Sequence, residues 1–163
     1  MNFKYGKIFK NNQTQKIEVV SYMSSCDYYS FIQEKKSLGL SQVIISSELM
    51  LKSIEFYFLD RKFDIMGIEL MEKDNIFCDE IDDYIQKTNK DRGYFTRLME
   101  KLKFLSDTDT IEILKVNLRK RNESGSPTSV LIQVNGIVRI NDTSYEEEVK
   151  EIKREIERYF LIE

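Results

Sequence analysis

Three aspartates, Asp79, Asp82 and Asp83, lie close together in the stretch CDEIDDYI and are the carboxylates best spaced for chemistry. If this stretch is helical, spacings of three and four residues put them on one face. Clustered carboxylates can hold Mg²⁺ or Mn²⁺ and support phosphoryl or nuclease chemistry. The simpler interpretation is a solvated helix N-terminus, where acids are favoured by the helix dipole, with Ile81 and Ile85 forming the buried side.

Most other catalytic chemistry is excluded by composition. The chain contains no histidine, which removes histidine-based nucleophile activation, general-base catalysis and HExxH zinc sites. Its six glycines are too scattered to form a phosphate-binding loop. Its two cysteines, Cys26 and Cys78, match no metal-ligand spacing and are expected to be reduced thiols. We therefore expect no cofactor and no enzymatic activity.

A basic β-hairpin between residues 111 and 140 is the second place where a ligand could bind. Strand alternation over 111–121 and 129–140 separates an apolar face from a polar, cationic one. The polar face would carry Lys115, Asn117, Arg119, Arg121, Gln133, Asn135 and Arg139. Three interpretations are open: the solvated back of a sheet, a surface for an acidic protein, or a contact with nucleic-acid phosphates. The hairpin itself offers no aromatic platform for stacking bases, which weighs against nucleic acid.

The elements that would position these residues follow from hydrophobic periodicity. Strands are expected at 3–9, 16–22, 54–59, 63–71, 111–121 and 129–140, and helices at 26–38, 79–88, 94–105 and 143–160. The segment 41–52 fits either a strand followed by a helix or one helix. Tyr28, Tyr29, Phe31 and Ile32 are expected to form the buried side of the first helix. The order ββα-ββαα-ββα predicts a single α+β domain over residues 1–163, with antiparallel hairpins and helices packed on one face.

The last helix carries an apolar stripe at alternating spacings of four and three residues. Its members are Tyr145, Val149, Ile152, Ile156 and Tyr159. The stripe is too short for a self-sufficient coiled coil, so we expect it to dock on the protein's own sheet, with self-association as the alternative. The apolar residues Phe160, Leu161 and Ile162 that follow suggest a homodimer, because a monomer would leave them near solvent.

Composition bounds the setting of the protein. A net charge of −3, no apolar run of membrane-spanning length and no secretory signal lead us to expect a cytoplasmic protein without a membrane partner. The absence of alanine indicates an AT-rich gene, as in a low-GC bacterium or its phages and mobile elements. The leading hypothesis is a non-enzymatic protein-binding module such as an adaptor, inhibitor or regulatory subunit. The alternatives are a nucleic-acid-binding protein that uses the basic hairpin and a metal-dependent nuclease or phosphodiesterase that uses the aspartates.

Overall fold

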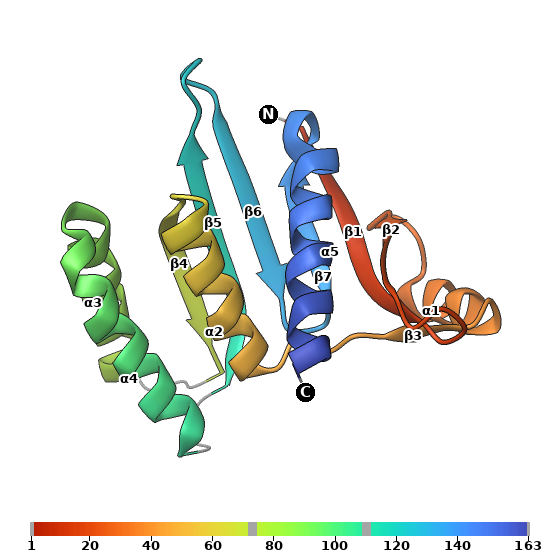
Figure 1. Ribbon diagram of the computed structural model, residues 1–163, viewed down its shortest axis with the longest axis horizontal. Helices are drawn as coiled ribbons and strands as arrows, with labels where there is room; N and C mark the ends of the chain where they lie inside the picture. The colour runs from red at the N-terminus through yellow and green to blue at the C-terminus, as the bar shows by residue number, and fades with distance from the viewer. Residues whose placement is uncertain (1, 72–74, 109–111, 163) are drawn as a thin grey trace.

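The computed structural model describes residues 2–71, 75–108 and 112–162, which form one antiparallel sheet with helices around it (Figure 1). The strands are β1 (Phe3–Asn11), β2 (Ile17–Tyr22), β3 (Leu40–Gln42), β4 (Asp64–Leu70), β5 (Ile113–Arg121), β6 (Pro127–Gln133) and β7 (Ile137–Asn141). They are ordered β2-β1-β7-β6-β5-β4, and the short β3 also pairs with β1. The first and last strands of the chain therefore lie side by side in the middle of the sheet, where β1 pairs with β7.

The helices are α1 (Tyr28–Ser37), α2 (Ser47–Glu55), α3 (Asn75–Lys90), α4 (Phe95–Asp107) and α5 (Tyr145–Ile162). Helices α2 and α5 lie across one face of the sheet, α4 packs beside α2, and α3 packs against the edge strand β4. The main core fills the space between these helices and the apolar sheet face, and its members include Met50, Leu98, Val116, Val138 and Ile152. The predicted α+β class is confirmed.

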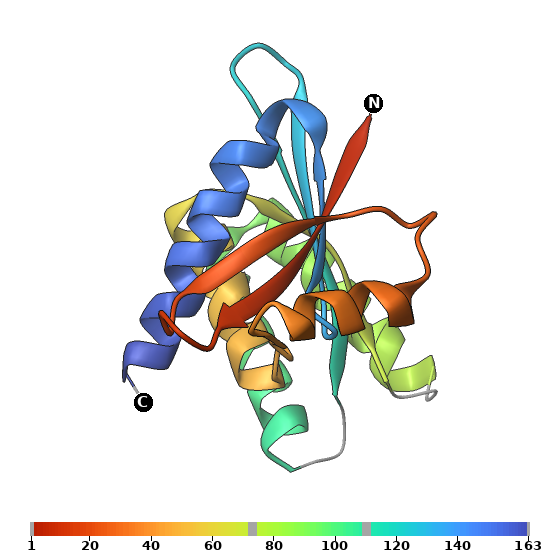
Figure 2. The same ribbon diagram turned by 90° about the vertical axis from the view of Figure 1, so that its right-hand side faces the viewer.

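Helix α1 packs on the opposite face of the sheet from α5 (Figure 2). Neighbouring residues of β1 point to opposite faces, so Ile8 joins the main core while Phe9 packs with Ile32 of α1 in a second, smaller cluster. The expected buried side of α1 is only partly correct. Ile32 is buried, whereas Tyr29 is 71% exposed, because the face of α1 that packs on the sheet carries Ile32 and Phe31.

The segment 54–59, predicted as a strand paired with 63–71, is helical instead. Helix α2 begins at the Ser46 cap, whose hydroxyl accepts from the Leu49 amide at 3.2 Å, and continues into a π-helical turn, η1 (Phe56–Asp60). The neighbouring residues Tyr57 and Phe58 are both buried. In a strand covered on one face only, one of these two side chains would point to solvent. The ambiguous segment before it resolves into β3 and α2. The element order therefore differs from the predicted ββα-ββαα-ββα, and β4 pairs with β5.

The predicted strand 129–140 is two strands, β6 and β7, joined by a tight turn. Gly136 takes φ +82° in this turn, a left-handed conformation that favours glycine. A Cβ there would lie 2.6 Å from the carbonyl oxygen of Val43. The neighbouring strand β5 begins at Ile113 rather than at the predicted residue 111 and ends at Arg121 as predicted; Ile111 itself lies outside the described residues.

Helix α5 docks on the sheet as predicted, with Ile152 and Ile156 buried and Val149 half-buried against the core. Burying each such side chain contributes roughly 1.5–3 kcal/mol, which fixes the helix on the sheet. A Cβ on Gly6 would lie 2.7 Å from the Tyr145 hydroxyl, so glycine permits the close approach of α5 to β1. Among the described helices, none is both long enough and apolar enough to cross a lipid bilayer.

Candidate functional site

The sheet surface opposite α2 and α5 carries most of the predicted binding residues. One row of directly paired residues crosses six strands of this surface: Gly67, Asn117, Leu131, Arg139, Tyr5 and Tyr22. Parallel rows on either side contain Arg119 opposite Ser129 and Lys115 opposite Gln133. We call this surface the open face and define it by Phe3, Tyr5, Lys115, Asn117, Arg119, Leu131, Gln133 and Arg139. The register brings together the strand residues that the sequence assigned to one polar face, and their role in binding stays a prediction.

Two predicted site residues lie at the margins of the open face. Arg121 is exposed at the end of β5, near the tip of the β5–β6 hairpin. Asn135 lies in the turn between β6 and β7, where its side-chain oxygen accepts from the Ile137 amide at 3.1 Å and its carbonyl accepts from Lys7. Asn135 therefore supports the turn and is half-buried there.

Within the described residues, the arginines of the open face have no acidic partner at ion-pair distance. Arg119 and Arg139 are half-buried on central strands, and the Nε atom of each is buried without a hydrogen-bond partner. Four other arginines of the described chain do lie within ion-pair distance of a carboxylate: Arg61, Arg92, Arg154 and Arg158. Half-buried guanidinium groups without a counter-charge are suited to binding an anion from outside the protein.

Among the described residues, acidic side chains balance the charge of the open face at its β4 side alone. Lys115 Nζ lies 3.6 Å from Glu69, its neighbour across the β4–β5 pair. Asp64 is paired in register with Arg119, yet its carboxylate lies 3.9 Å from Arg92. The uncompensated positive charge of the open face is therefore centred on Arg119 and Arg139.

Aromatic side chains from β1 lie beside these arginines. The guanidinium carbon of Arg139 lies 4.7 Å from the ring centroid of Phe3, in a cation–π contact, and Phe3 is 39% exposed. Tyr5 is paired directly with Arg139 on one side and with Tyr22 on the other. Sequence reasoning missed this platform because β1 and β7 lie at opposite ends of the chain. The alternation Phe3, Tyr5, Lys7, Phe9 was the one local signal of an unusual strand face.

Lys7 continues this strand face beneath α1 and is completely buried. Its Nζ donates to the carbonyl oxygen of Asn135 and lies 5.7 Å from the ring centroid of Tyr28. Among the described residues, no carboxylate lies within ion-pair distance of this amine. Burial lowers its pKa from 10.5 to about 8, since the charged form is poorly solvated there. Lys7 is thus a buried cation without a counter-charge, on the same sheet face as Arg119 and Arg139.

The three aspartates of the predicted metal site are exposed on α3 and do not converge. Asp83 instead pairs with Lys87, one turn along the helix, at 3.0 Å. Within the described residues, no group of three acidic, cysteine or histidine side chains is arranged to hold a metal ion. The geometry fits the simpler interpretation of Asp79, Asp82 and Asp83 as a solvated helix face.

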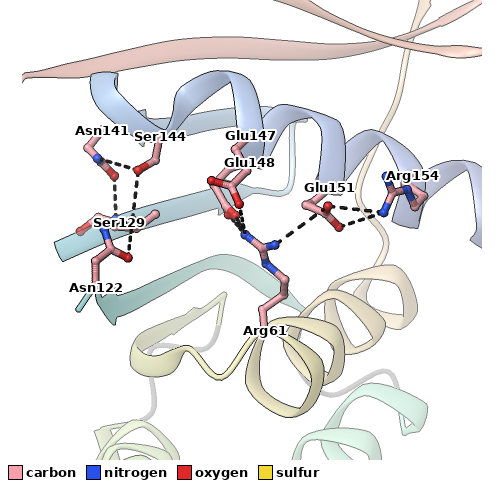
Figure 3. A network of polar contacts seen from close by, with 10 residues as sticks. Arg61, Asn122, Ser129, Asn141, Ser144, Glu147, Glu148, Glu151 and Arg154 are labelled. Carbon is pink, nitrogen blue, oxygen red and sulfur yellow. Dashed lines mark hydrogen bonds and ion pairs between the residues drawn. The ribbon is translucent and has the colours of Figure 1, made fainter. Parts of the chain in front are cut away.

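A polar network at the N-terminal end of α5 is the most buried charged cluster of the described chain (Figure 3). Arg61, which follows η1, donates to both carboxylate oxygens of the buried Glu148 and lies 3.7 Å from Glu147 and 3.9 Å from Glu151. Burial raises the pKa of Glu148, and the neighbouring Arg61 opposes this shift. Beside it, the Ser144 hydroxyl lies 3.0 Å from that of Thr128. These contacts fasten α5 to η1 and to β6.

A buried hydroxyl without a partner accompanies this network. Tyr57 is 1% exposed, and its hydroxyl has no hydrogen-bond partner. Burial raises its pKa, and the negative charge of Glu148 raises it further. A phenol that stays protonated in this way cannot serve as a base near neutral pH, and the surrounding carboxylates are engaged by Arg61 and Arg154. We therefore assign the network to fastening α5 rather than to ligand binding.

The stripe proposed for self-association lies largely inside the protein. Tyr145, Ile152 and Ile156 are buried, and Val149 and Tyr159 pack against the main core. A dimer seam along this stripe would require α5 to leave the sheet. Homodimer formation itself stays a prediction, and any interface must use other residues.

Comparison with protein-family models, with curated proteins and with solved structures found no match to this chain. The open face is therefore the strongest guide to function.

Proposed function

We propose that this chain is a non-enzymatic binding protein whose open face binds single-stranded nucleic acid. The observation that carries the proposal is the pair of arginines without acidic partners, Arg119 and Arg139, next to the β1 aromatics Phe3 and Tyr5. Single-strand binding combines cationic side chains that follow the phosphate backbone with aromatic rings on which bases stack. From strand spacing, the Cα atoms of the two arginines are about 12 Å apart, so they would contact different phosphates.

The sequence alone favoured a protein partner because its basic hairpin has no aromatic residues. The position of β1 beside β7 supplies them, which supports nucleic acid over an acidic protein surface. An acidic protein could also satisfy the arginines, and the oligoglutamate probe described below tests that alternative. Exposed aromatic rings also suit a single strand better than a duplex, whose bases are already stacked.

Fluorescence anisotropy with labelled oligothymidine, oligouridine, duplex DNA and oligoglutamate tests this proposal. The double variant Arg119→Glu, Arg139→Glu should weaken single-strand binding by at least about 100-fold, since a hydrogen bond to a charged group contributes about 1.5–3 kcal/mol and 1.4 kcal/mol is tenfold. The matched control is Lys52→Glu, Arg97→Glu, which changes net charge equally at exposed positions of α2 and α4. This control variant should bind single strands with nearly the affinity of the unmodified protein.

A Phe3→Leu variant separates base stacking from simple charge attraction. Loss of the ring should weaken single-strand binding by about 1–3 kcal/mol, while binding to oligoglutamate would be unaffected. Preferential binding of oligoglutamate, or equal binding by the arginine variant and its control, would contradict the proposal. Absence of single-strand binding at low salt would also contradict it.

A further inference from the structure

The two edges of the sheet differ in how their outward backbone groups are satisfied. At the β4 edge, the Asn89 side chain of α3 donates to the Ile65 carbonyl at 2.6 Å and accepts from the Ile65 amide at 3.1 Å. Asn89 thus occupies the place of a neighbouring strand. Capping of this kind protects an edge from pairing with another chain.

The β2 edge is capped only at its first residue. The Ile17 amide donates to Glu157 of α5 at 3.1 Å, whereas the Lys16 carbonyl accepts from Asn11, the last residue of β1, at 2.8 Å. The backbone groups of Ile17 therefore point away from β1. Because strand residues alternate, those of Val19 and Ser21 point outward as well. Within the described residues, β2 has no strand neighbour other than β1, so these groups are available for pairing.

The β2 edge is complementary to a second copy of itself. If two copies pair antiparallel about a two-fold axis at Val20, then Val19 of each copy lies opposite Ser21 of the other. Each such pair is a hydrogen-bonded pair, because both residues point their backbone groups outward. Val20 would then lie opposite Val20 in a non-hydrogen-bonded pair. The edge carries no proline and no lysine between residues 17 and 22, the residues that commonly block such pairing.

The same register places the exposed Met23 of one copy opposite the buried Ile17 of the other and beside the exposed apolar residues at the end of α5. Ile17 would lie opposite Met23 of the second copy, and directly opposed residues share one face of a sheet. Ile17, Phe160 and Leu161 line a surface pocket on the α5 side of β2. Met23 is 63% exposed and Leu161 is 85% exposed in the single chain. Pairing through β2 would cover Met23 and Leu161 in each of the two copies.

We propose that the chain forms a two-fold homodimer by antiparallel pairing of β2 with β2 of a second copy, with Met23 of each copy against Phe160 and Leu161 of the other. The sheet continues across the interface. The interface uses the part of the β2 edge beyond the Glu157 cap on Ile17, and it therefore does not require α5 to undock. The side chain of Ile162, which the sequence grouped with this apolar tail, lies outside the described residues.

Sedimentation equilibrium of Ser21→Pro and Ser21→Ala tests the backbone pairing. The outward amide of Ser21 makes no bond to β1, so proline removes an interface donor while leaving the β1 ladder intact. We expect the unmodified chain and Ser21→Ala to be dimers and Ser21→Pro to be a monomer with an unchanged far-ultraviolet spectrum. A monomeric mass for the unmodified chain, or a dimeric mass for folded Ser21→Pro, overturns the proposal.

A cross-linking test fixes the register even if the proline variant fails to fold. In a background with Cys26→Ser and Cys78→Ser, Val20→Cys should form a disulfide-linked dimer under mild oxidation, because non-hydrogen-bonded partners have Cα atoms about 4.5 Å apart. Glu18→Cys is the control. Its two copies would be offset by about 13 Å along the strands, beyond disulfide reach. Cross-linking of the Glu18 variant, or none of the Val20 variant, overturns the proposed register.

Discussion

At the scale of single residues, Lys7 is the charge that folding favours least. Its side chain is completely buried, where its amine donates to the Asn135 carbonyl and lies over the ring of Tyr28. The pKa falls to about 8 because burial disfavours the ammonium form. A lysine retained under these conditions lowers the stability of the fold, which is common where a residue serves a function.

The lowered pKa of Lys7 predicts that stability rises with pH in the alkaline range. Between pH 8 and 10.5 the unfolded chain holds a proton on Lys7 that the folded chain has released, so the free energy of unfolding increases with pH. Below pH 8 the residue is charged in both states and the full cost of burial remains. That cost is roughly 3 kcal/mol, from the pKa shift and 1.36 kcal/mol per unit.

Urea unfolding of Lys7→Met and of the unmodified chain across this pH range measures the effect. The variant should be more stable at pH 7, and its advantage should shrink as the pH rises from 8 to 10.5. Comparing the two curves cancels the titration of the tyrosines. An advantage that stays constant over that range would show that Lys7 does not titrate as described.

At the scale of elements, the edge strand β4 depends on a side chain from α3. Asn89 pairs with both backbone groups of Ile65, and Ile65 is completely buried. This contact explains how β4 can lie at the edge of the sheet without a strand neighbour on its outer side. It also accounts for the firm packing of α3 against β4.

Removing the Asn89 amide should therefore destabilise the fold. Asn89→Ala leaves the amide and carbonyl of Ile65 without protein partners, and a buried unpaired polar group costs about 1–3 kcal/mol. Gln86→Ala, an exposed substitution on the same helix, should change stability by less than about 0.5 kcal/mol. Chemical denaturation reports both values, and hydrogen exchange at the Ile65 amide should accelerate only in the Asn89 variant. Equal stability of the two variants would contradict this role for Asn89.

At the scale of the whole molecule, the distribution of charge matters more than its sum. The net charge is −3, yet the open face holds unpaired arginines while acids gather on α3 and α5. With this distribution of charge, the protein should bind single strands through the open face and repel them elsewhere. Its affinity should then depend steeply on salt, because neutralised phosphates release counterions.

The salt dependence of oligothymidine binding tests that distribution. The slope of the logarithm of affinity against the logarithm of salt concentration is about −0.7 for each phosphate contact with a single strand. The double variant Arg119→Glu, Arg139→Glu should reduce the magnitude of this slope by at least about 1.4, because two phosphate contacts are lost. Lys52→Glu, Arg97→Glu should leave the slope nearly unchanged. An equal reduction in both variants would mean that overall charge, rather than the open face, controls binding.

The sequence by itself determined the features that depend on local periodicity and on composition. Alternation along β5 assigned Lys115, Asn117 and Arg119 to one face, because side-chain direction repeats every two residues in a strand. The apolar stripe of α5 predicted docking through Ile152 and Ile156, because side-chain direction repeats every 3.6 residues in a helix. The absence of histidine limits the chemistry in any fold. Local pattern failed at 54–59, where aromatic residues common in strands form a helix that buries Tyr57 and Phe58 together.

Only the tertiary structure decided which strands lie side by side. Pairing β1 with β7 brings Tyr5 next to Arg139, and the candidate site depends on that contact. No local pattern encodes this pairing, because an antiparallel strand with one apolar face can pair with several others. Which strands pair depends on how all the helices and strands bury their apolar surface together. The partners of buried charges were decided in the same way. Glu148 meets Arg61 and Lys7 meets no carboxylate within the described chain, because packing between distant segments, rather than spacing along the chain, sets which polar groups meet.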